Sequence, residues 1–222
     1  MKGDRRSRGP HRRQRPLYER KGSLYDLATA LPERPVREAV IAMLAPAPGD
    51  RVLEVGCGPG RLAVGLAQAV GPRGRVDAVD RSPQMLRRAA RRAARAGLGA
   101  RVRFCLAEPP PLPYSAGEFD DVVMVFLLET LPAEDAELLP DECRRVLSSC
   151  GRLCAAAVSE HGGFGPAVVL YQRLHAAFPQ FIDCRPICLR ERFARSGFQT
   201  VQQRIMRLFG LGVEIVLARP AD

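Results

Sequence analysis

The chain has 222 residues, a formal net charge of +10 and seven cysteines. This length allows one substantial hydrophobic core, so we expect a single folded domain. No apolar run approaches the roughly 18 residues that a membrane-spanning helix needs, and the N-terminus lacks the apolar stretch of a secretory signal. We therefore expect no membrane span and a cytoplasmic protein.

The cysteines do not form a recognisable framework. Their number is odd, and they are scattered through apparent strands and helices, which is not the pattern of a disulfide-bonded domain. The pairs Cys150-x3-Cys154 and Cys184-x3-Cys188 offer four thiols, but their spacing matches no common zinc site. The sequence therefore predicts free thiols and no bound metal.

The positive charge is concentrated at the N-terminus. Residues 1–21 hold nine basic and two acidic residues, a net charge of +7, which leaves only +3 for the rest of the chain. A segment with this charge and almost no apolar residues cannot bury enough surface to order itself, so residues 1–22 are predicted to be a disordered basic tail. Such a tail is either a solvated extension or, less favoured here, a contact for nucleic acid or an anionic surface.

The rest of the chain, residues 23–222, alternates between strand and helix patterns and reads as one domain. Apolar residues at helical spacing predict one or two N-terminal helices within residues 23–48. Strands are then predicted at 51–56, 75–80, 102–106, 119–127 and 151–158, with helices between them at 60–70, 83–96 and 133–147. Inserted helices follow at 165–178 and 188–196, and a hairpin of two strands at 198–206 and 210–217 ends the chain.

This alternation predicts an α/β fold. Five strands joined by helices give a Rossmann-like, doubly wound, mostly parallel sheet, and the hairpin adds two antiparallel strands at its C-terminal side, making seven. In such sheets ligands bind beyond the carboxyl ends of the strands, where the strand order reverses. Residues that follow the predicted strands are therefore the candidates for a functional site.

The first predicted strand runs into a glycine loop that favours a nucleoside ligand. Glu54 is followed by Gly56, Gly58 and Gly60, and a helical pattern begins directly afterwards. Glycines at alternate positions let the backbone turn sharply and approach a ligand, and the next helix presents free N–H groups. A dinucleotide site expects Gly-x-Gly-x-x-Gly, so the third glycine comes one residue early here. Glu54 would also repel a pyrophosphate, which favours a cationic ligand.

Asp80 ends the second predicted strand, 26 residues after Glu54. A carboxylate at this place accepts hydrogen bonds from both hydroxyls of a ribose. Ser82 and Pro83 begin the following helix, so the alternative is that Asp80 only caps that helix. Because Asp80 is paired with the glycine loop, we favour ribose binding.

These motifs resemble those of the class I S-adenosylmethionine-dependent methyltransferases. Glu54-x-Gly56-x-Gly58-x-Gly60 is similar to the first motif of that family, and Asp80 matches its second acid. The resemblance is close over residues 50–158 and implies S-adenosyl-L-methionine as cofactor. It implies that Glu54 lies near the amino acid end of the cofactor and that the loop, with Cys57 inside it, passes beneath.

Further cofactor contacts are implied by the same resemblance. Arg81 and Met85 follow Asp80 and are expected beside the cofactor. Glu108, before Leu-Pro-Tyr, occupies the place of a family aspartate near the adenine amino group. The backbone around Phe126, after the fourth strand, is expected to accept from the cofactor's ammonium group. The segment from Glu142 to Leu147 resembles the fifth region of the family, although Ser148-Ser149-Cys150-Gly151 departs from its usual turn.

Candidates for catalysis and acceptor binding follow the fourth and fifth strands. Glu129 and His161 are candidate bases, because a base is needed if the methylated atom carries a proton. Tyr171 and His175 lie four residues apart on a predicted helix and share a face. Together with Arg185 they are predicted to line the acceptor pocket, within an inserted segment that spans residues 160–196.

The predicted function is methyl transfer to a small molecule, in the subgroup that resembles ubiquinone and menaquinone C-methyltransferases; a quinone or phenol is the expected kind of acceptor. The N-terminal helices would then act as a lid. Two alternatives stay open: an RNA or protein methyltransferase that uses the basic tail, and a protein that binds the cofactor without catalysis. Against methylation of bases, the fourth strand lacks the Asn/Asp-Pro-Pro-Tyr element associated with it.

Overall fold

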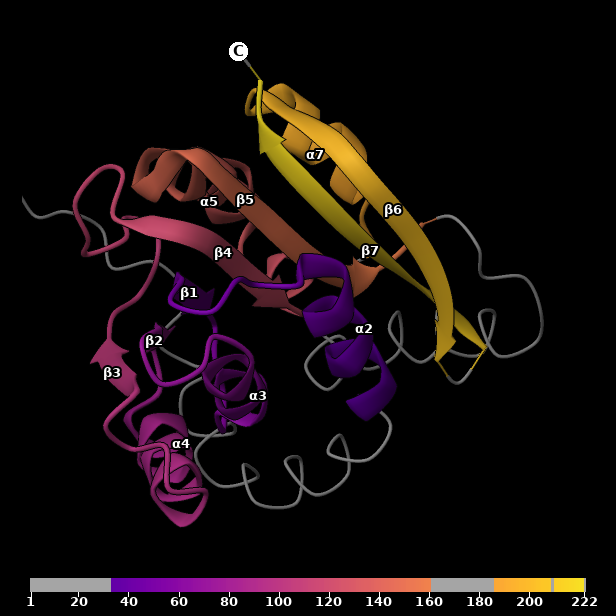
Figure 1. Ribbon diagram of the computed structural model, residues 1–222. Coiled ribbons are helices and arrows are strands. Elements are labelled where there is room, and N and C mark those ends of the chain that lie inside the picture. The colour runs from indigo at the N-terminus through magenta and orange to yellow at the C-terminus, as the bar shows by residue number, and fades with distance from the viewer. Residues whose placement is uncertain (1–32, 161–185, 209, 222) are drawn as a thin grey trace, which may run out of the picture.

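The computed structural model describes residues 33–160, 186–208 and 210–221 (Figure 1). The strands are β1 (Arg51–Val55), β2 (Arg75–Asp80), β3 (Val102–Leu106), β4 (Phe119–Val125), β5 (Leu147–Val158), β6 (Phe198–Leu208) and β7 (Leu211–Pro220). The helices are α2 (Arg34–Leu44), α3 (Arg61–Ala69), α4 (Pro83–Arg95), α5 (Ala133–Val146) and α7 (Leu189–Arg195), with a short 3-10 helix, η2 (Leu128–Thr130), after β4. None of the helices in these ranges is long and apolar enough to cross a membrane.

The strands form one seven-stranded sheet in the order β3-β2-β1-β4-β5-β7-β6. The first five are parallel, and β7 pairs antiparallel with both β5 and β6. This confirms the predicted Rossmann-like sheet with its antiparallel C-terminal hairpin. The strand order reverses between β1 and β4, and the carboxyl end of β1 lies there.

Helices cover both faces of the sheet, with α2, α3 and α4 on one side and α5 and α7 on the other (Figure 1). Neighbouring residues of one strand point into different cores: Val52 belongs to the core under α2 and α3, whereas Leu53 belongs to the core under α5. The same holds for Val123 and Val122 in β4. Strands buried on both faces explain why the sequence shows continuous apolar runs rather than alternation.

The start of β5 differs from the prediction. The strand begins at Leu147, directly after α5, instead of at Gly151. Leu147 pairs with Phe119, after which the register shifts and Asp121 pairs with Arg152. Gly151 lies in this irregular stretch, where an added Cβ would come within 2.8 Å of the Leu147 side chain. The polar, glycine-containing segment looks like a turn in sequence, yet its backbone continues the strand.

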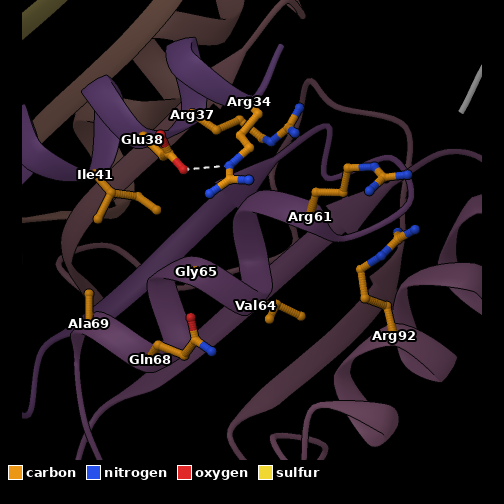
Figure 2. Close-up of a pocket in the computed structure, with 10 residues that line it drawn as sticks. All are labelled: Arg34, Arg37, Glu38, Ile41, Arg61, Val64, Gly65, Gln68, Ala69 and Arg92. Atoms are coloured by element: carbon orange, nitrogen blue, oxygen red, sulfur yellow. Dashed lines mark hydrogen bonds and ion pairs between the residues drawn. The ribbon is translucent and has the colours of Figure 1, made fainter. Parts of the chain in front are cut away.

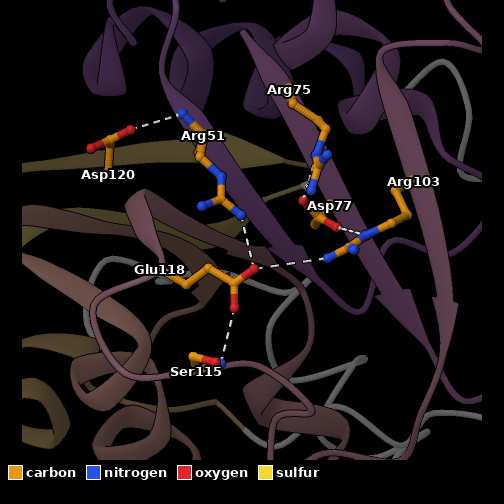
Figure 3. Close-up of polar contacts among 7 residues, drawn as sticks. All are labelled: Arg51, Arg75, Asp77, Arg103, Ser115, Glu118 and Asp120. Atoms are coloured by element: carbon orange, nitrogen blue, oxygen red, sulfur yellow. Dashed lines mark hydrogen bonds and ion pairs between the residues drawn. The ribbon is translucent and has the colours of Figure 1, made fainter.

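A cluster of ion pairs joins the amino-terminal ends of the first four strands (Figure 3). This is the end of the sheet opposite the carboxyl ends, where a ligand is expected to bind. The fully buried Asp77 of β2 accepts hydrogen bonds from Arg75 and from Arg103 of β3. Glu118, before β4, accepts from Arg51 of β1 at 2.8 Å. Because the cluster connects four strands, we expect its role to be the stabilisation of the sheet.

Glu142 and Arg145 hold the loop before β4. The Glu142 carboxylate accepts from the N–H of Leu112 at 2.8 Å and from the Arg145 guanidinium at 2.8 Å. Arg145 also donates to the carbonyl oxygens of Leu112 and Tyr114, at 3.0 and 2.8 Å. The Glu-x-x-Arg part of the fifth region therefore ties α5 to the segment that follows β3.

Candidate cofactor site

The chain turns sharply where β1 ends, and three glycines make the turn. Gly56, Gly58 and Gly60 have φ angles of +74°, +49° and +75°, in the left-handed region that glycine adopts without a Cβ clash. The N–H groups of Gly56 and Cys57 both donate to the carbonyl oxygen of Val79, at 2.8 and 2.9 Å, so the loop is fixed to the end of β2. Gly60 is the N-cap of α3, and the free N–H groups of that helix therefore lie at the loop.

The middle of the loop and its end at α3 have different surroundings. A Cβ on Gly60 would come within 2.6 Å of the Cβ of Ala89 in α4, so the loop packs tightly there. A Cβ on Gly58 would meet nothing within 4 Å. The backbone at Gly58 is therefore exposed on a side that a ligand can approach.

Asp80 connects this loop to α4. Its Oδ2 accepts from the N–H of Gly58 at 2.8 Å, and its Oδ1 accepts from the N–H of Ser82 at 2.8 Å. Ser82 in turn caps α4, because its Oγ accepts from the N–H of Met85 at 3.3 Å. Burial raises the pKa of Asp80, and the two backbone N–H groups oppose the rise. Each carboxylate oxygen keeps a lone pair that a ligand hydroxyl can use.

Glu54 is a buried carboxyl group with an unsatisfied oxygen. Its side chain is 4% exposed, and Oε2 has no hydrogen-bond partner among the described residues. Burial, with repulsion from Asp80, raises its pKa well above the usual range, while the N–H of Ala63 and the charge of Arg37 oppose the rise. A buried acceptor without a partner costs free energy. A ligand that places a cation or a hydrogen-bond donor beside Glu54 would recover this free energy.

Cys57 and Met85 are both buried beside the loop. Burial raises the pKa of the Cys57 thiol well above its usual range, and the nearby Glu54 and Asp80 raise it further, so the thiol stays protonated. It acts as a small apolar residue rather than a nucleophile. Met85 lies on the first turn of α4 and packs into the core.

Arg81 and Glu108 lie at the ends of β2 and β3. The N–H of Ala107 donates to the carbonyl oxygen of Asp80 at 3.2 Å, which brings these two strand ends together. The guanidinium of Arg81 and the carboxylate of Glu108 are 3.9 Å apart, and both side chains are exposed. The two residues thus form the outer rim beyond Asp80.

The end of β4 supplies Phe126 and Glu129. Phe126 has a φ of +53°, which is rare for an aromatic residue and is tolerated mainly where the surroundings enforce it. Its N–H donates to the carbonyl oxygen of Ala156 in β5 at 2.8 Å. Glu129, in η2, is 2% exposed; its Oε1 accepts from the N–H of Val158 at 3.1 Å, and its Oε2 has no partner among the described residues. Burial raises the pKa of Glu129 to about 7.

The structure places the cofactor candidates near the carboxyl ends of β1, β2, β3 and β4, and the acceptor candidates fall elsewhere in the chain. His161, Tyr171, His175 and Arg185 lie outside the described residues, as do residues 1–32. In the part of the chain that is described, no group of three or more His, Cys, Asp or Glu side chains is gathered as a metal site.

Sequence reasoning missed two features near the loop. Arg37 of α2, the helix directly before β1, lies close enough to Glu54 to influence its pKa. Arg92 of α4 donates to the carbonyl oxygen of Pro59 inside the loop, a contact that helical spacing alone does not indicate. Figure 2 shows both arginine side chains at a groove between α2, α3 and α4. Helical spacing shows which residues share a side, but it does not show which neighbour faces that side.

Comparisons with known proteins find similarity to methyltransferases. A family described as "Methyltransferase domain" matches residues 52–151. A ubiquinone/menaquinone biosynthesis C-methyltransferase of Rhizobium johnstonii is 34% identical over 126 residues, covering 56% of this chain and 48% of the relative. A nocamycin O-methyltransferase of Saccharothrix syringae is 33% identical over 137 residues, covering 62% of this chain and 48% of the relative. The chain therefore spans about half the length of these relatives.

A solved structure with the same fold is the magnesium protoporphyrin IX methyltransferase of Synechocystis PCC 6803 with bound SAH. It has a TM-score of 0.70 and 20% sequence identity, and the match covers 86% of this chain and 84% of that one. At this identity the likeness establishes the fold alone.

Proposed function

We propose that the chain is a class I S-adenosylmethionine-dependent methyltransferase that transfers a methyl group to a small molecule, supported by the match of residues 52–151 to a methyltransferase domain family and by the named relatives. The observation that carries the proposal is the unsatisfied Oε2 of Glu54 beside the open backbone of Gly58 and the carboxylate of Asp80. This combination suits a ligand with both a cationic end and a ribose.

The residues at the switch point fit S-adenosylmethionine. Asp80 would accept from the ribose hydroxyls, and Glu54 would receive the positive amino acid end. Arg81 and Glu108, at the rim, would border the adenine, while the backbone at Phe126 faces the same strand ends from β4. The bound cofactor supplies an electrophilic methyl group on a sulfonium. The protein has to hold donor and acceptor in line and exclude water.

Glu129 is our candidate for the base among the described residues. With a pKa of about 7, its carboxyl group is part ionised near neutral pH, which is the range in which a side chain both takes up and releases a proton. The N–H of Val158 fixes one oxygen, so the other is held in a constant position. His161 remains the alternative base, and residues 160–196, with Tyr171, His175 and Arg185, remain our proposal for the acceptor side.

We favour a small acceptor of the quinone or phenol type. The support comes from the named relatives, one a C-methyltransferase of quinone biosynthesis and one an O-methyltransferase. Residues 23–48 would cover the cofactor as a lid, with α2 as its described part.

The cofactor part of the proposal is tested by calorimetry with S-adenosylhomocysteine. We expect the wild-type protein to bind it and Asp80→Asn to bind it at least about tenfold more weakly, because one ionic acceptor is lost. Asp120→Asn is the matched control, since Asp120 also accepts from a backbone N–H but at the opposite edge of the sheet. No binding by the wild type, or equal weakening in both variants, would contradict the proposal.

The acceptor is tested by transfer of a labelled methyl group into fractionated cell extract, followed by mass spectrometry of the product. We expect label in a small aromatic or quinone fraction. Label in RNA or protein that disappears when residues 1–20 are removed would favour the alternative that uses the basic tail. Cofactor binding without any labelled product would favour a protein that binds without catalysis.

A further inference from the structure

The strand β6 lies at the outer edge of the sheet and is paired with β7 alone in the part of the chain that the structure describes (Figure 1). Its middle, residues 201–205, is exposed at every position. Because successive side chains of a strand point to opposite faces, both faces of β6 are open to solvent there. The backbone groups on its outer side are a template for a further strand.

Two large apolar side chains lie in this exposed stretch. Val201 is 55% exposed and Ile205 is 47% exposed. They are two of only four large apolar side chains that are exposed among the described residues, and they are four residues apart on one strand. A strand that pairs with β6 would remove apolar surface from water at both places, which favours association.

Val201 is also the extra residue of a β-bulge. Thr200 pairs with Ala218 and Gln202 pairs with Leu217, so no residue of β7 lies opposite Val201. A bulge is one device that discourages pairing at an edge, but β6 contains neither a proline nor a lysine, which are the other common devices. Val201 is therefore left for a contact on the outer side of the strand.

The β6 sequence is complementary to itself when two copies run antiparallel. A two-fold axis at Gln203, the centre of the exposed stretch, places Val201 of each copy opposite Ile205 of the other. Moving the axis by half a residue in either direction would place Ile205 opposite Thr200 or Gln202. The register about Gln203 is thus the one that joins the two exposed apolar side chains.

The polar side chains of β6 match in the same register. Gln202 lies opposite Arg204, and Gln199 lies opposite Arg207. In each pair the amide oxygen can accept from the guanidinium, and no two like charges are directly opposite. Charge therefore does not oppose this pairing.

We propose that β6 is the interface of a homodimer, in which two copies of the strand pair antiparallel about Gln203 and join their sheets into one. Pairing about a two-fold axis uses the β6 edge of both copies, so the assembly closes at two chains. The proposal does not depend on methyl transfer. It is tested by the oligomeric state alone, so its failure and that of the proposed function are distinguishable.

The association is tested by sedimentation velocity of the full-length protein over a range of concentrations. We expect a dimer for the wild type and an at least about tenfold larger dissociation constant for Ile205→Lys, because a lysine on an edge strand opposes pairing. Leu138→Lys is the matched control, since it makes the same change at a residue on α5 that is 48% exposed. We also expect the dimer to persist at high salt, because the contacts do not depend on ion pairs.

Three outcomes of this experiment would overturn the proposal. The first is a wild type that stays monomeric, and the second is an equal loss of association in both lysine variants. The third is a dimer that dissociates as salt is added, which would point to pairing of oppositely charged surfaces instead.

The register is tested by disulfide formation under mild oxidation, in a Cys150→Ser background because Cys150 is an exposed thiol. We expect Gln203→Cys to give a cross-linked dimer, because directly opposite residues are about 4.5–5.5 Å apart between their Cα atoms. Gln199→Cys is the control: residue 199 lies opposite Arg207, so its two copies are about 26 Å apart. Equal cross-linking of both variants, or none of Gln203→Cys, would overturn the register.

The side chain of Gln203 also donates to Glu214 of β7, so its replacement removes a contact within the chain. Gln203→Ser removes the same contact without adding a thiol. We expect this variant to sediment as a dimer. A monomeric Gln203→Ser together with unchanged association of Ile205→Lys would place the interface elsewhere and would overturn the proposal.

Discussion

Gly58 and Gly60 share a left-handed backbone conformation, yet they are required for different reasons. At Gly60 the restriction comes from the fold, because the Cβ of Ala89 occupies the space that a side chain would need. At Gly58 the space is open, so the restriction comes from the proposed ligand. Within one motif, Gly60 is therefore needed for stability, and Gly58 is proposed to be needed for ligand binding.

Alanine at each position tests this separation. We expect Gly60→Ala to lower the free energy of unfolding by about 3 kcal/mol, through overpacking against α4 added to backbone strain. Gly58→Ala should cost only about 1 kcal/mol but weaken S-adenosylhomocysteine binding at least about tenfold. Gly71→Ala is the control, with the same backbone strain and no contact within 4 Å. Chemical unfolding and calorimetry measure the two effects, and normal binding by Gly58→Ala would contradict this role.

At the scale of secondary structure elements, Asp121 and Arg152 join the central strands β4 and β5. The two residues are direct partners in the strand register, and the guanidinium of Arg152 donates to both oxygens of Asp121, at 2.9 and 3.0 Å. Asp121 is fully buried, and burial raises its pKa to about 6 in spite of the arginine. The pair holds the strands at the point where the register resumes after the irregular start of β5.

Removal of one partner should therefore destabilise the sheet. We expect Arg152→Gln to lower the free energy of unfolding by about 2–3 kcal/mol at pH 7.5, less than for a fully buried pair because Arg152 is partly exposed. The double variant Asp121→Asn with Arg152→Gln should recover part of this loss, since no buried charge is left unpaired. Urea unfolding measures both, and a double variant that is less stable than the single one would contradict this account.

For the molecule as a whole, buried acids make stability depend on pH. Among the described residues, burial raises the pKa of four carboxyl groups, those of Glu54, Asp80, Asp121 and Glu129. In the unfolded chain each releases its proton at lower pH, so from about pH 4 to about pH 7 the folded state binds more protons, and stability falls as pH rises. Glu118 and Glu142, whose pKa values are lowered by hydrogen bonds, act oppositely but only below about pH 4.5.

Glu129→Gln isolates one part of this dependence. Glutamine keeps an oxygen for the N–H of Val158 but does not titrate. Because the pKa of Glu129 is raised from 4.5 to about 7, the variant should gain about 3 kcal/mol of stability relative to the wild type between pH 4.5 and pH 8. Urea unfolding at several pH values measures this, with the exposed Glu134→Gln as control. A difference between Glu129→Gln and wild type that stays constant with pH would contradict the buried, protonated state.

The sequence predicted the fold well because local signals and the global arrangement agree. Apolar runs bounded by Gly, Pro and Ser82 marked the strands and helices. Because strands that alternate with helices run parallel, their carboxyl ends lie together, and this brings Glu54, the glycines and Asp80 to the same end of the sheet. Sequence reasoning failed where a role depends on tertiary packing. Arg37 comes within electrostatic range of Glu54, and Arg92 donates to Pro59 in the loop, only because α2 and α4 pack there, and no periodicity encodes these contacts. The early start of β5 was missed because the polar residues before Gly151 interrupt the apolar pattern, although the strand runs through them with a shift in register.

The two hydrogen bonds that Asp80 accepts from the N–H groups of Gly58 and Ser82 affect how fast and how selectively a ligand binds. Both bonds lie within the protein, so they hold the loop in one conformation and leave little backbone entropy to be lost on association. A ligand that fits this rigid template binds without waiting for the loop to order. One that needs the loop to move must first break two hydrogen bonds to the partly buried carboxylate of Asp80, so we expect nucleosides of slightly different shape to be rejected at the binding step.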